Sequence, residues 1–317
     1  NEFKLEDEAN RKKNWKKLIH TKKNDEKCKS SNVPSMSSST VSMEDQLIML
    51  NLSELLPSII AISEQAGAAI MAIYNQPERW NLQQKADNSP LTAADLAAHQ
   101  LIEHALQQLT ATIPVLSEES DDISQRHTWS QLWLVDPLDG TKEFVARTND
   151  FTVNIALIAE NKPILGVLHA PAYGVTYYAA EGLGAWIIDQ KQQVRRLVTA
   201  ELPIIPRILL SRRHQGHEEA QTLANIAMTF GDYTVLHVGS AFKMCRIAEG
   251  AADFYPRFGA TMEWDTAAAQ ILLTEAGGLL VDQQGQPLRY NCRETLTNGA
   301  FFVIGEKKQL SQWLACL

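Results

Sequence analysis

Two aspartates, Asp136 and Asp139, follow an apolar run that has the composition of a buried strand. Pro137 and Gly140, which favour turns, lie beside them. Pro137 fixes its own φ, and Gly140 tolerates backbone angles that a Cβ would hinder. We therefore expect the two carboxylates and the Leu138 carbonyl to converge at the end of the strand. Oxygen ligands of this kind suit magnesium, so the segment predicts a magnesium site. The plainer alternative is an ordinary acidic turn.

Other oxygen-bearing side chains stand where they could join this site. Thr141 comes two residues after the second aspartate and offers a hydroxyl, and Glu118 follows a short predicted strand. Asp95 and Asp265 each lie near the start of a predicted helix. Each acid also has a simpler explanation. Asp95 would complete a capping box with Thr92, Asp265 would cap its helix, and the glutamate would lie in a solvated loop.

In chain order these motifs are D…E-E-S…D-P-L-D-G-T…W-D, and the order resembles the inositol monophosphatase superfamily of magnesium-dependent, lithium-sensitive phosphatases. The resemblance covers residues 52–305. It implies a set of ligands for two or three magnesium ions, namely Glu118, Asp136, the Leu138 carbonyl, Asp139 and Asp265. It also implies that Asp95 and Thr141 align and deprotonate the attacking water. Metal ions in such a site bind phosphate oxygens and stabilise the leaving alkoxide, so no Ser, Cys or His nucleophile is required.

The second half of the chain contains residues that suit a second phosphate. Ser240 and Lys243 lie in G-S-A-F-K, at the start of a predicted helix whose N-terminus could take an anion. Arg257 lies in Y-P-R-F-G. The simpler alternatives are a solvated lysine and an arginine that pairs with Asp253 or Glu249.

Within the superfamily, these segments resemble the 3'(2'),5'-bisphosphate nucleotidases of the CysQ type. In inositol monophosphatases the position that matches Arg257 is usually acidic. The resemblance implies that Ser240, Lys243 and Arg257 bind the 5'-phosphate and that His214 contacts the adenine. The full substrate-binding set that it implies is Glu118, Leu138, Asp139, Gly140, Thr141, His214, Ser240, Lys243, Arg257 and Asp265.

The function that this resemblance implies is hydrolysis of adenosine 3',5'-bisphosphate to AMP and phosphate, with magnesium as cofactor. A further candidate substrate is 3'-phosphoadenylyl sulfate, in sulfur assimilation. Two alternatives stay open: an inositol or sugar monophosphatase, and a metal-dependent regulatory protein that binds RNA or a polymerase through residues 1–30. A cytoplasmic location is expected, with peripheral association at the cytoplasmic face of the inner membrane as in bacterial relatives. The oligomeric state stays open.

Composition narrows the class of protein. The chain has 317 residues, of which 45% are hydrophobic, and no stretch approaches 18 uninterrupted apolar residues, so no transmembrane helix is predicted. Four cysteines without a C-x-x-C pair argue against a zinc site or a disulfide framework. Residues 1–30 carry ten basic and six acidic side chains, whereas the rest carries a net charge of −12. An acidic body is a poor nucleic-acid binder, but it accepts an anionic substrate where metal ions dominate the local field.

The elements that must position these residues fall into three segments. Residues 1–42 are basic and then Ser-rich, which predicts a disordered or non-native tail. Residues 43–200 are predicted to form a metal-binding α+β subdomain with an antiparallel sheet. Residues 201–317 alternate strands and helices and are predicted to form a substrate-binding α/β subdomain with a mixed sheet. Together they indicate a layered sandwich, for which the resemblance implies the αβαβα order of inositol monophosphatases. Helices are expected at 52–74, 93–109, 217–229, 242–249 and 265–275.

Overall fold

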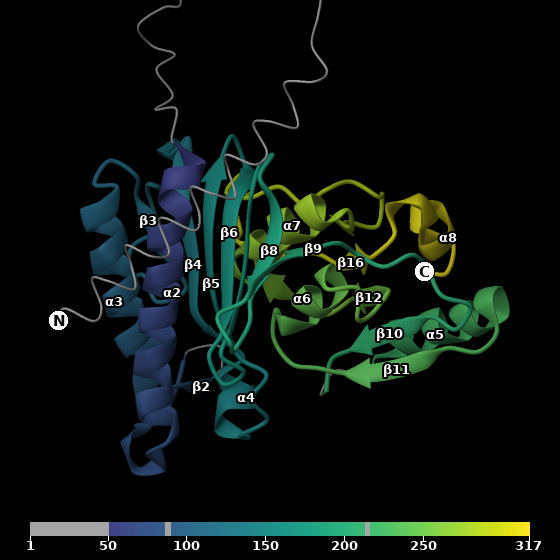
Figure 1. Ribbon diagram of the computed structural model, residues 1–317, viewed down its shortest axis with the longest axis horizontal. Coiled ribbons are helices and arrows are strands. Elements are labelled where there is room, and N and C mark those ends of the chain that lie inside the picture. Colours follow the sequence, from purple (N-terminus) through teal and green to yellow (C-terminus); the bar gives the residue numbers. More distant parts are fainter. Residues whose placement is uncertain (1–50, 86–89, 213–215) are drawn as a thin grey trace, which may run out of the picture. The chain divides into compact units, whose positions relative to one another are not determined.

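The computed structural model describes residues 51–85, 90–212 and 216–317 (Figure 1). The predicted tail, residues 1–42, lies outside the described residues. The chain divides into two units, of which residues 58–317 form the larger, compact one. The sheets described below belong to the larger unit.

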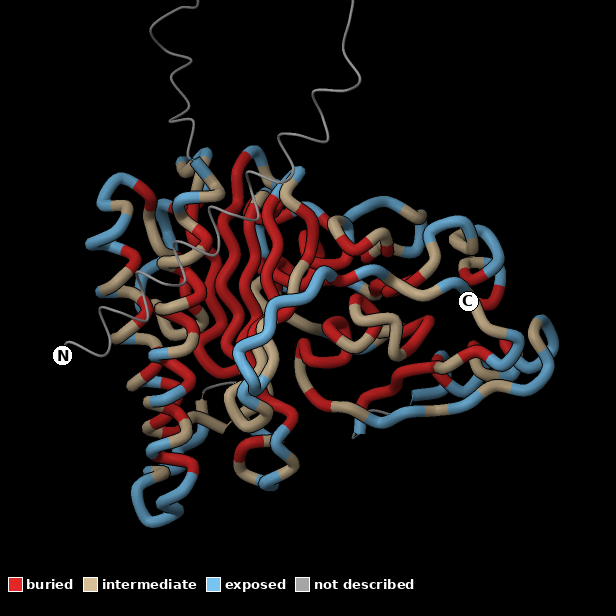
Figure 2. Tube along the Cα trace, in the orientation of Figure 1, coloured by how far each residue is buried: buried red, intermediate tan, exposed pale blue. Residues whose placement is uncertain are grey.

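A large sheet contains seven strands in the described part of the chain, in the order β3-β4-β5-β6-β7-β8-β9. Strand β3 pairs parallel with β4, and the remaining neighbours pair antiparallel. Every residue of β5 is buried, and so are most residues of its neighbours β4 and β6 (Figure 2). A sheet that is covered on both faces needs apolar residues on both, which explains the nearly continuous apolar runs. The strands are β3 (Val115–Ser117), β4 (Gln131–Asp139), β5 (Thr152–Ala159), β6 (Lys162–Ala170), β7 (Val175–Ala180), β8 (Gly184–Ile188) and β9 (Val194–Leu197).

Helices α2 (Leu52–Tyr74) and α3 (Ala93–Leu109) have the predicted bounds. Within the larger unit, α2 lies close to the sheet at Gly67, where an added Cβ would be 2.3 Å from Cδ2 of His169. By length and composition alone α2 could span a membrane, with a mean hydropathy of 1.5. Half of the apolar 18-residue stretch of this helix is buried in the protein. Core helices of soluble proteins have the same length and composition.

His169, which is 8% exposed, provides a pH-dependent contribution to stability. Burial lowers its pKa from the ordinary 6.5 to about 4, because the imidazolium would lose its water. The unfolded chain therefore binds a proton near pH 6.5 and the folded chain near pH 4. The stability from this group is complete above pH 6.5 and is lost as the pH falls toward 4, by about 1.4 kcal/mol per pH unit.

We expect His169→Gln to flatten the fall in the free energy of unfolding between pH 6.5 and 4. Urea unfolding of parent and variant at several pH values measures this difference. The exposed His104, replaced in the same way, is the matched control and is expected to follow the parent. Parallel curves for parent and His169→Gln would show that His169 titrates alike in the folded and unfolded chains.

A smaller sheet has five strands in the described residues, in the order β11-β10-β12-β16-β14. Strands β11, β10 and β12 run parallel, and β16 runs antiparallel to both β12 and β14, which makes this a mixed sheet as predicted. The strands are β10 (Arg207–Leu210), β11 (Thr234–His237), β12 (Phe254–Arg257), β14 (Leu279–Val281) and β16 (Phe301–Ile304). Two-stranded pairs are β1 (Gln83–Gln84) with β2 (Pro90–Leu91) and β13 (Thr261–Met262) with β15 (Thr297–Asn298).

The remaining helices complete the layers. Helices α6 (Phe242–Ala248) and α7 (Glu263–Ala276) share a core with residues of both sheets, and so lie between them (Figure 1). Helices α5 (His217–Phe230) and α8 (Leu310–Leu314) cover the other face of the smaller sheet, where Trp313 stacks on Phe254 with ring centroids 4.4 Å apart. The order helix, sheet, helix, sheet, helix confirms the predicted sandwich. The predicted boundary at residue 200 falls between β9 and β10.

Three local features differ from the prediction. The acidic motif does not end its strand: β4 continues to Asp139, with a register shift after Asp136, because both residues still pair with β5. Helix α7 begins at Glu263, and its N-cap is Met262. Asp265 is therefore not the N-cap but the third residue of the helix, and it accepts a hydrogen bond from the Met262 N–H at 2.8 Å. Strand β9 and helix α8 were not predicted, because one is largely exposed and the other has five residues.

Candidate active site

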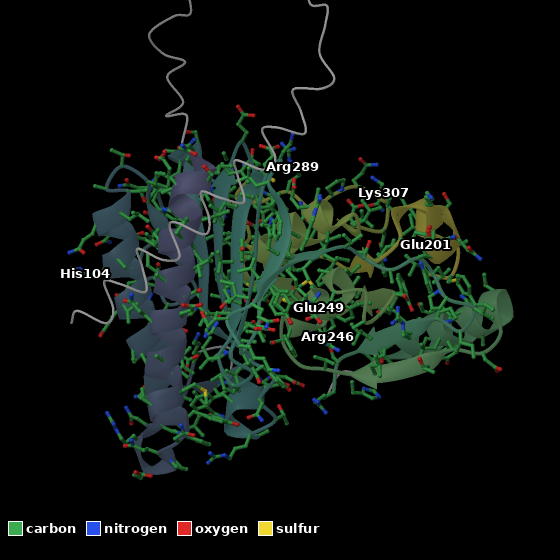
Figure 3. The ribbon with its side chains drawn as sticks, in the orientation of Figure 1. His104, Glu201, Arg246, Glu249, Arg289 and Lys307 are labelled. Atoms are coloured by element: carbon green, nitrogen blue, oxygen red, sulfur yellow. The ribbon has the colours of Figure 1, made fainter. Side chains whose placement is uncertain are left out.

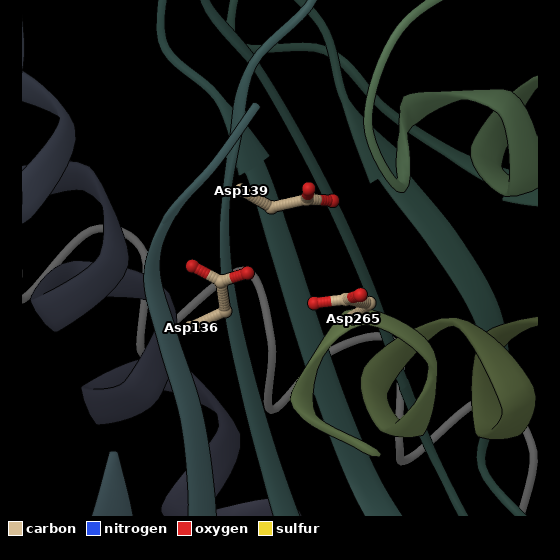
Figure 4. Close-up of side chains that lie close together, drawn as sticks. All are labelled: Asp136, Asp139 and Asp265. Carbon is tan, nitrogen blue, oxygen red and sulfur yellow. The ribbon is translucent and has the colours of Figure 1, made fainter. Parts of the chain in front are cut away.

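Three carboxylates meet between the large sheet and α7. Oxygens of Asp136 and Asp139, from β4, and of Asp265, from α7, all lie within 4.8 Å of one another (Figure 4). Asp136 is buried and the other two are partly exposed. Desolvation and the neighbouring carboxylates raise the pKa of Asp136 and Asp265 well above their ordinary values. Desolvation raises the pKa of Asp139 to about 6. Carboxyl groups this close repel one another when they ionise, which costs free energy. A bound cation would offset that repulsion.

The donor atoms at this point fit a divalent cation. The three side chains offer only carboxylate oxygens, and among the described residues no other group of acidic, His or Cys ligands comes as close together. The Leu138 carbonyl lies beside them and accepts a hydrogen bond from the Thr141 hydroxyl at 3.3 Å. An all-oxygen set of this kind suits magnesium. Gly140 adopts φ = +93°, a left-handed backbone conformation that a Cβ would hinder, and it directly precedes the short helix α4 (Thr141–Val145).

Asp95 serves the helix cap and the site at once. Its Oδ2 accepts hydrogen bonds from the N–H and hydroxyl of Thr92, at 2.8 and 2.6 Å, which is the predicted capping box. Its Oδ1 accepts the hydroxyl of Thr141 at 3.0 Å. The two interpretations of Asp95 are therefore compatible. Desolvation raises its pKa to about 6, although hydrogen bonds to Thr92 and Thr141 act in the opposite direction.

Glu118 lies beside the three carboxylates but is not one of the group. Its Oε1 accepts a hydrogen bond from Lys85 at 2.6 Å, and the same ammonium contacts Glu119 at 2.5 Å. The charge of Glu118 nevertheless contributes to the raised pKa values of Asp136 and Asp265. Its role as a metal ligand stays a prediction. Sequence reasoning missed Lys85, which stands in a polar stretch without a recognisable motif.

One pocket joins the carboxylates to the smaller sheet. Asp139 and Asp265 form part of its wall. The loop before α6 and the ends of β10 and β12 form other parts. Five of the ten predicted substrate-binding residues line it, and Glu118, Leu138, Gly140 and Thr141 do not. Its walls are formed by Asp139, Lys142, Glu143, Ser211, Arg212, Val238, Gly239, Ser240, Ala241, Lys243, Met244, Tyr255, Arg257, Thr261, Asp265 and Phe301. His214 lies outside the described residues.

The predicted cations of this pocket are not idle surface side chains. Lys243 is 5% exposed, and its ammonium donates to the Ser240 carbonyl at 2.8 Å. The Arg257 guanidinium donates to the Ser211 hydroxyl at 3.1 Å and to two loop carbonyls beyond β12.

The ion pairs considered as alternatives for Arg257 do not form. Asp253 pairs with Arg207 at 2.7 Å, and Glu249 pairs with Arg246 at 3.1 Å (Figure 3). Both acids therefore have other partners, and the Arg257 guanidinium stays at the pocket wall.

Two N–H groups at the N-terminus of α6 have partners within the protein. The Ala241 N–H donates to Oδ2 of Asp139, and the Phe242 N–H donates to the Ser240 hydroxyl at 3.2 Å. These donors therefore hold the loop onto the acidic motif, and the binding of a substrate anion at this N-terminus stays a prediction. Ser240 adopts φ = +47°, and Gly140 passes so close that an added Cβ would be 3.1 Å from the serine Cβ.

Residues 51–316 match the profile of the inositol monophosphatase family. The chain is 44% identical over 250 residues to 3'(2'),5'-bisphosphate nucleotidase CysQ of Escherichia coli strain K12, covering 78% of this chain and 99% of that protein. It is 39% identical over 262 residues to CysQ of Haemophilus influenzae, covering 82% and 96%. The crystal structure of CysQ from Bacteroides thetaiotaomicron superposes with a TM-score of 0.70 at 37% identity, covering 81% and 99%.

Proposed function

Because this chain belongs to the inositol monophosphatase family, we propose that it is a magnesium-dependent 3'(2'),5'-bisphosphate nucleotidase that hydrolyses adenosine 3',5'-bisphosphate to AMP and phosphate. The observation that carries this proposal is the shared pocket, which is lined by Asp139 and Asp265 and also by Lys243 and Arg257. A bisphosphate needs both features, since one phosphate must be activated while the other is held. The same site is suited to 3'-phosphoadenylyl sulfate.

The acidic group and its neighbours would hold the magnesium ions through Asp136, Asp139, Asp265, Glu118 and the Leu138 carbonyl. Bound there, the ions would polarise the phosphate and acidify the attacking water.

The protein's own part is to orient that water and accept its proton. The Thr141 hydroxyl donates to Asp95 at 3.0 Å, which leaves the lone pairs of its oxygen to accept a hydrogen bond from the water. With its pKa near 6, Asp95 is ionised at neutral pH and is still basic enough to take up the proton. The arginine and lysine of the pocket would bind the phosphate that is not cleaved.

Arg257→Ala tests the assignment to a bisphosphate. A hydrogen bond to a charged group contributes about 1.5–3 kcal/mol net, so we expect kcat/KM for the bisphosphate to fall roughly 10- to 150-fold. Hydrolysis of 3'-AMP, which lacks the 5'-phosphate, is expected to be slow in the parent and nearly unchanged in the variant. Arg257→Lys should recover part of the loss, because the planar guanidinium fork is missing.

Arg289→Ala is the matched control, since Arg289 is exposed and lies outside the pocket. Steady-state phosphate release gives all of these values. Equal losses for 3'-AMP and the bisphosphate would contradict the assignment, because Arg257 would then support only the fold.

A further inference from the structure

Asp150, two residues before β5, is a buried carboxylate that contacts three other segments of the chain. Its Oδ1 accepts the hydroxyl of Tyr173 at 2.8 Å, and its Oδ2 accepts the N–H of Gly239 at 2.9 Å. The same Oδ2 accepts a hydrogen bond from Nε of Arg212 at 2.9 Å and forms an ion pair with its Nη2 at 2.8 Å. The side chain of Asp150 is 3% exposed. The carboxylate is thus enclosed by donors, and it holds the arginine in one orientation.

Arg212 lies at the pocket wall beside Arg257. Its side chain is 40% exposed and lines the pocket. Ser211, the preceding residue, follows β10 and accepts a hydrogen bond from Arg257 at 3.1 Å. Strands β10 and β12 are parallel neighbours, so the two arginines extend from adjacent carboxyl ends of the smaller sheet. This edge is where ligands bind in open α/β sheets.

The guanidinium of Arg212 keeps N–H donors that Asp150 does not use. A guanidinium carries five N–H donors, and Asp150 engages two of its nitrogens along one edge. A fork that is fixed in this way loses little freedom when it binds a tetrahedral oxyanion, which it can grip with two parallel hydrogen bonds. Two of the acids that line the same pocket, Asp139 and Asp265, belong to the metal-binding group, so the second anion is left to the cationic side chains of the pocket.

We infer that Arg212 is a specificity-determining residue that binds, together with Arg257, the anionic group on the 5' side of the substrate, and that Asp150 is the positioning residue that fixes it. This inference rests on the proposed function and adds a residue pair to that site. The group bound is a phosphate or the phosphosulfate that replaces it. Sequence reasoning missed the pair because its members are 62 residues apart, although Arg212 stands only two residues before His214.

Arg212→Gln tests the inference with two readouts. We expect KM for adenosine 3',5'-bisphosphate to rise roughly 10- to 150-fold, with kcat and the hydrolysis of 3'-AMP nearly unchanged. We also expect AMP, which carries a 5'-phosphate and is not hydrolysed, to bind the variant more weakly by a similar factor in calorimetry. A loss for 3'-phosphoadenylyl sulfate equal to that for the bisphosphate would assign Arg212 to the phosphate. A loss confined to the phosphosulfate would assign it to the sulfate.

Asp150→Asn separates positioning from binding. The cation remains in this variant while its fixed orientation is lost, so we expect a KM increase for the bisphosphate that is smaller than in Arg212→Gln. Combining the two substitutions should add little to Arg212→Gln, because Asp150 acts through the arginine.

A matched ion pair supplies the control. Arg207 donates Nε and Nη2 to the buried Asp253, at 2.9 and 2.7 Å, and neither residue lines the pocket. Arg207→Gln therefore removes a similar arginine from a similar buried aspartate, and we expect the preference for the bisphosphate over 3'-AMP to stay as in the parent.

Equal proportional losses for 3'-AMP and the bisphosphate in Arg212→Gln, with unchanged AMP affinity, would overturn the inference. A parent enzyme that binds AMP through Arg212 but does not hydrolyse the bisphosphate would overturn the proposed function alone.

Discussion

Asp136→Asn is expected to abolish turnover. Asp136 is the buried member of the three-carboxylate group, and the substitution removes its charge while keeping its size. Metal ions in such sites contribute several kcal/mol to transition-state stabilisation, so we expect kcat to fall about 10³-fold or more. Phosphate release at saturating magnesium measures the loss. The exposed Asp232, replaced by asparagine, is the matched control and should leave the rate unchanged.

The same substitution should leave the fold intact. The folded-state pKa of Asp136 is raised by burial and by its acidic neighbours, so its contribution to stability is present at low pH and is lost as the pH rises through the folded pKa. At pH 7 without metal, the variant should therefore melt at or above the temperature of the parent. A variant that melts far below the parent would make the lost activity a folding defect. A variant that keeps a tenth of the parental rate would exclude Asp136 as a necessary ligand.

Asp95→Asn and Thr141→Ala are expected to lower kcat about 10²- to 10⁴-fold, the range typical of general base catalysis. Neither residue needs to hold the substrate, so KM should change little. The double variant should be hardly worse than either single one, because Asp95 and Thr141 act on the same proton through one hydrogen bond. In the parent, kcat should fall as the pH drops below about 6, where Asp95 becomes protonated. In the variants, kcat should no longer show this fall below about pH 6.

The capping role of Asp95 provides the control for this prediction. Asparagine keeps an acceptor for the Thr92 N–H, so the melting temperature should fall modestly, whereas the rate falls by orders of magnitude. A variant with a lower melting temperature and the parental kcat would show that Asp95 only caps α3.

The sequence predicted those parts of the site that are built from local motifs. The strand that carries Asp136 and Asp139 is apolar enough to recognise, helix α3 follows the capping residue Thr92, and α6 begins two residues after Ser240. The layered order of the sandwich followed from the change from a meander of strands to alternating strands and helices. The family resemblance then joined acidic residues that are far apart in the sequence.

The parts that were missed depend on contacts between distant segments. Nothing near Lys85 in sequence indicates that it binds Glu118, and nothing near Asp150 indicates that it holds Arg212. The register shift in β4 depends on continued pairing with β5, which no local pattern specifies. Asp95 shows that a capping role and a site role are not alternatives, since each of its oxygens serves one of them.

The most direct test of the nucleotidase assignment is kcat/KM for adenosine 3',5'-bisphosphate, inositol 1-phosphate and fructose 1,6-bisphosphate, measured side by side in magnesium and in excess EDTA. We predict that the adenosine bisphosphate has the highest value in magnesium and that all three activities vanish in EDTA. A higher value for inositol 1-phosphate, or full activity in excess EDTA, would contradict the assignment.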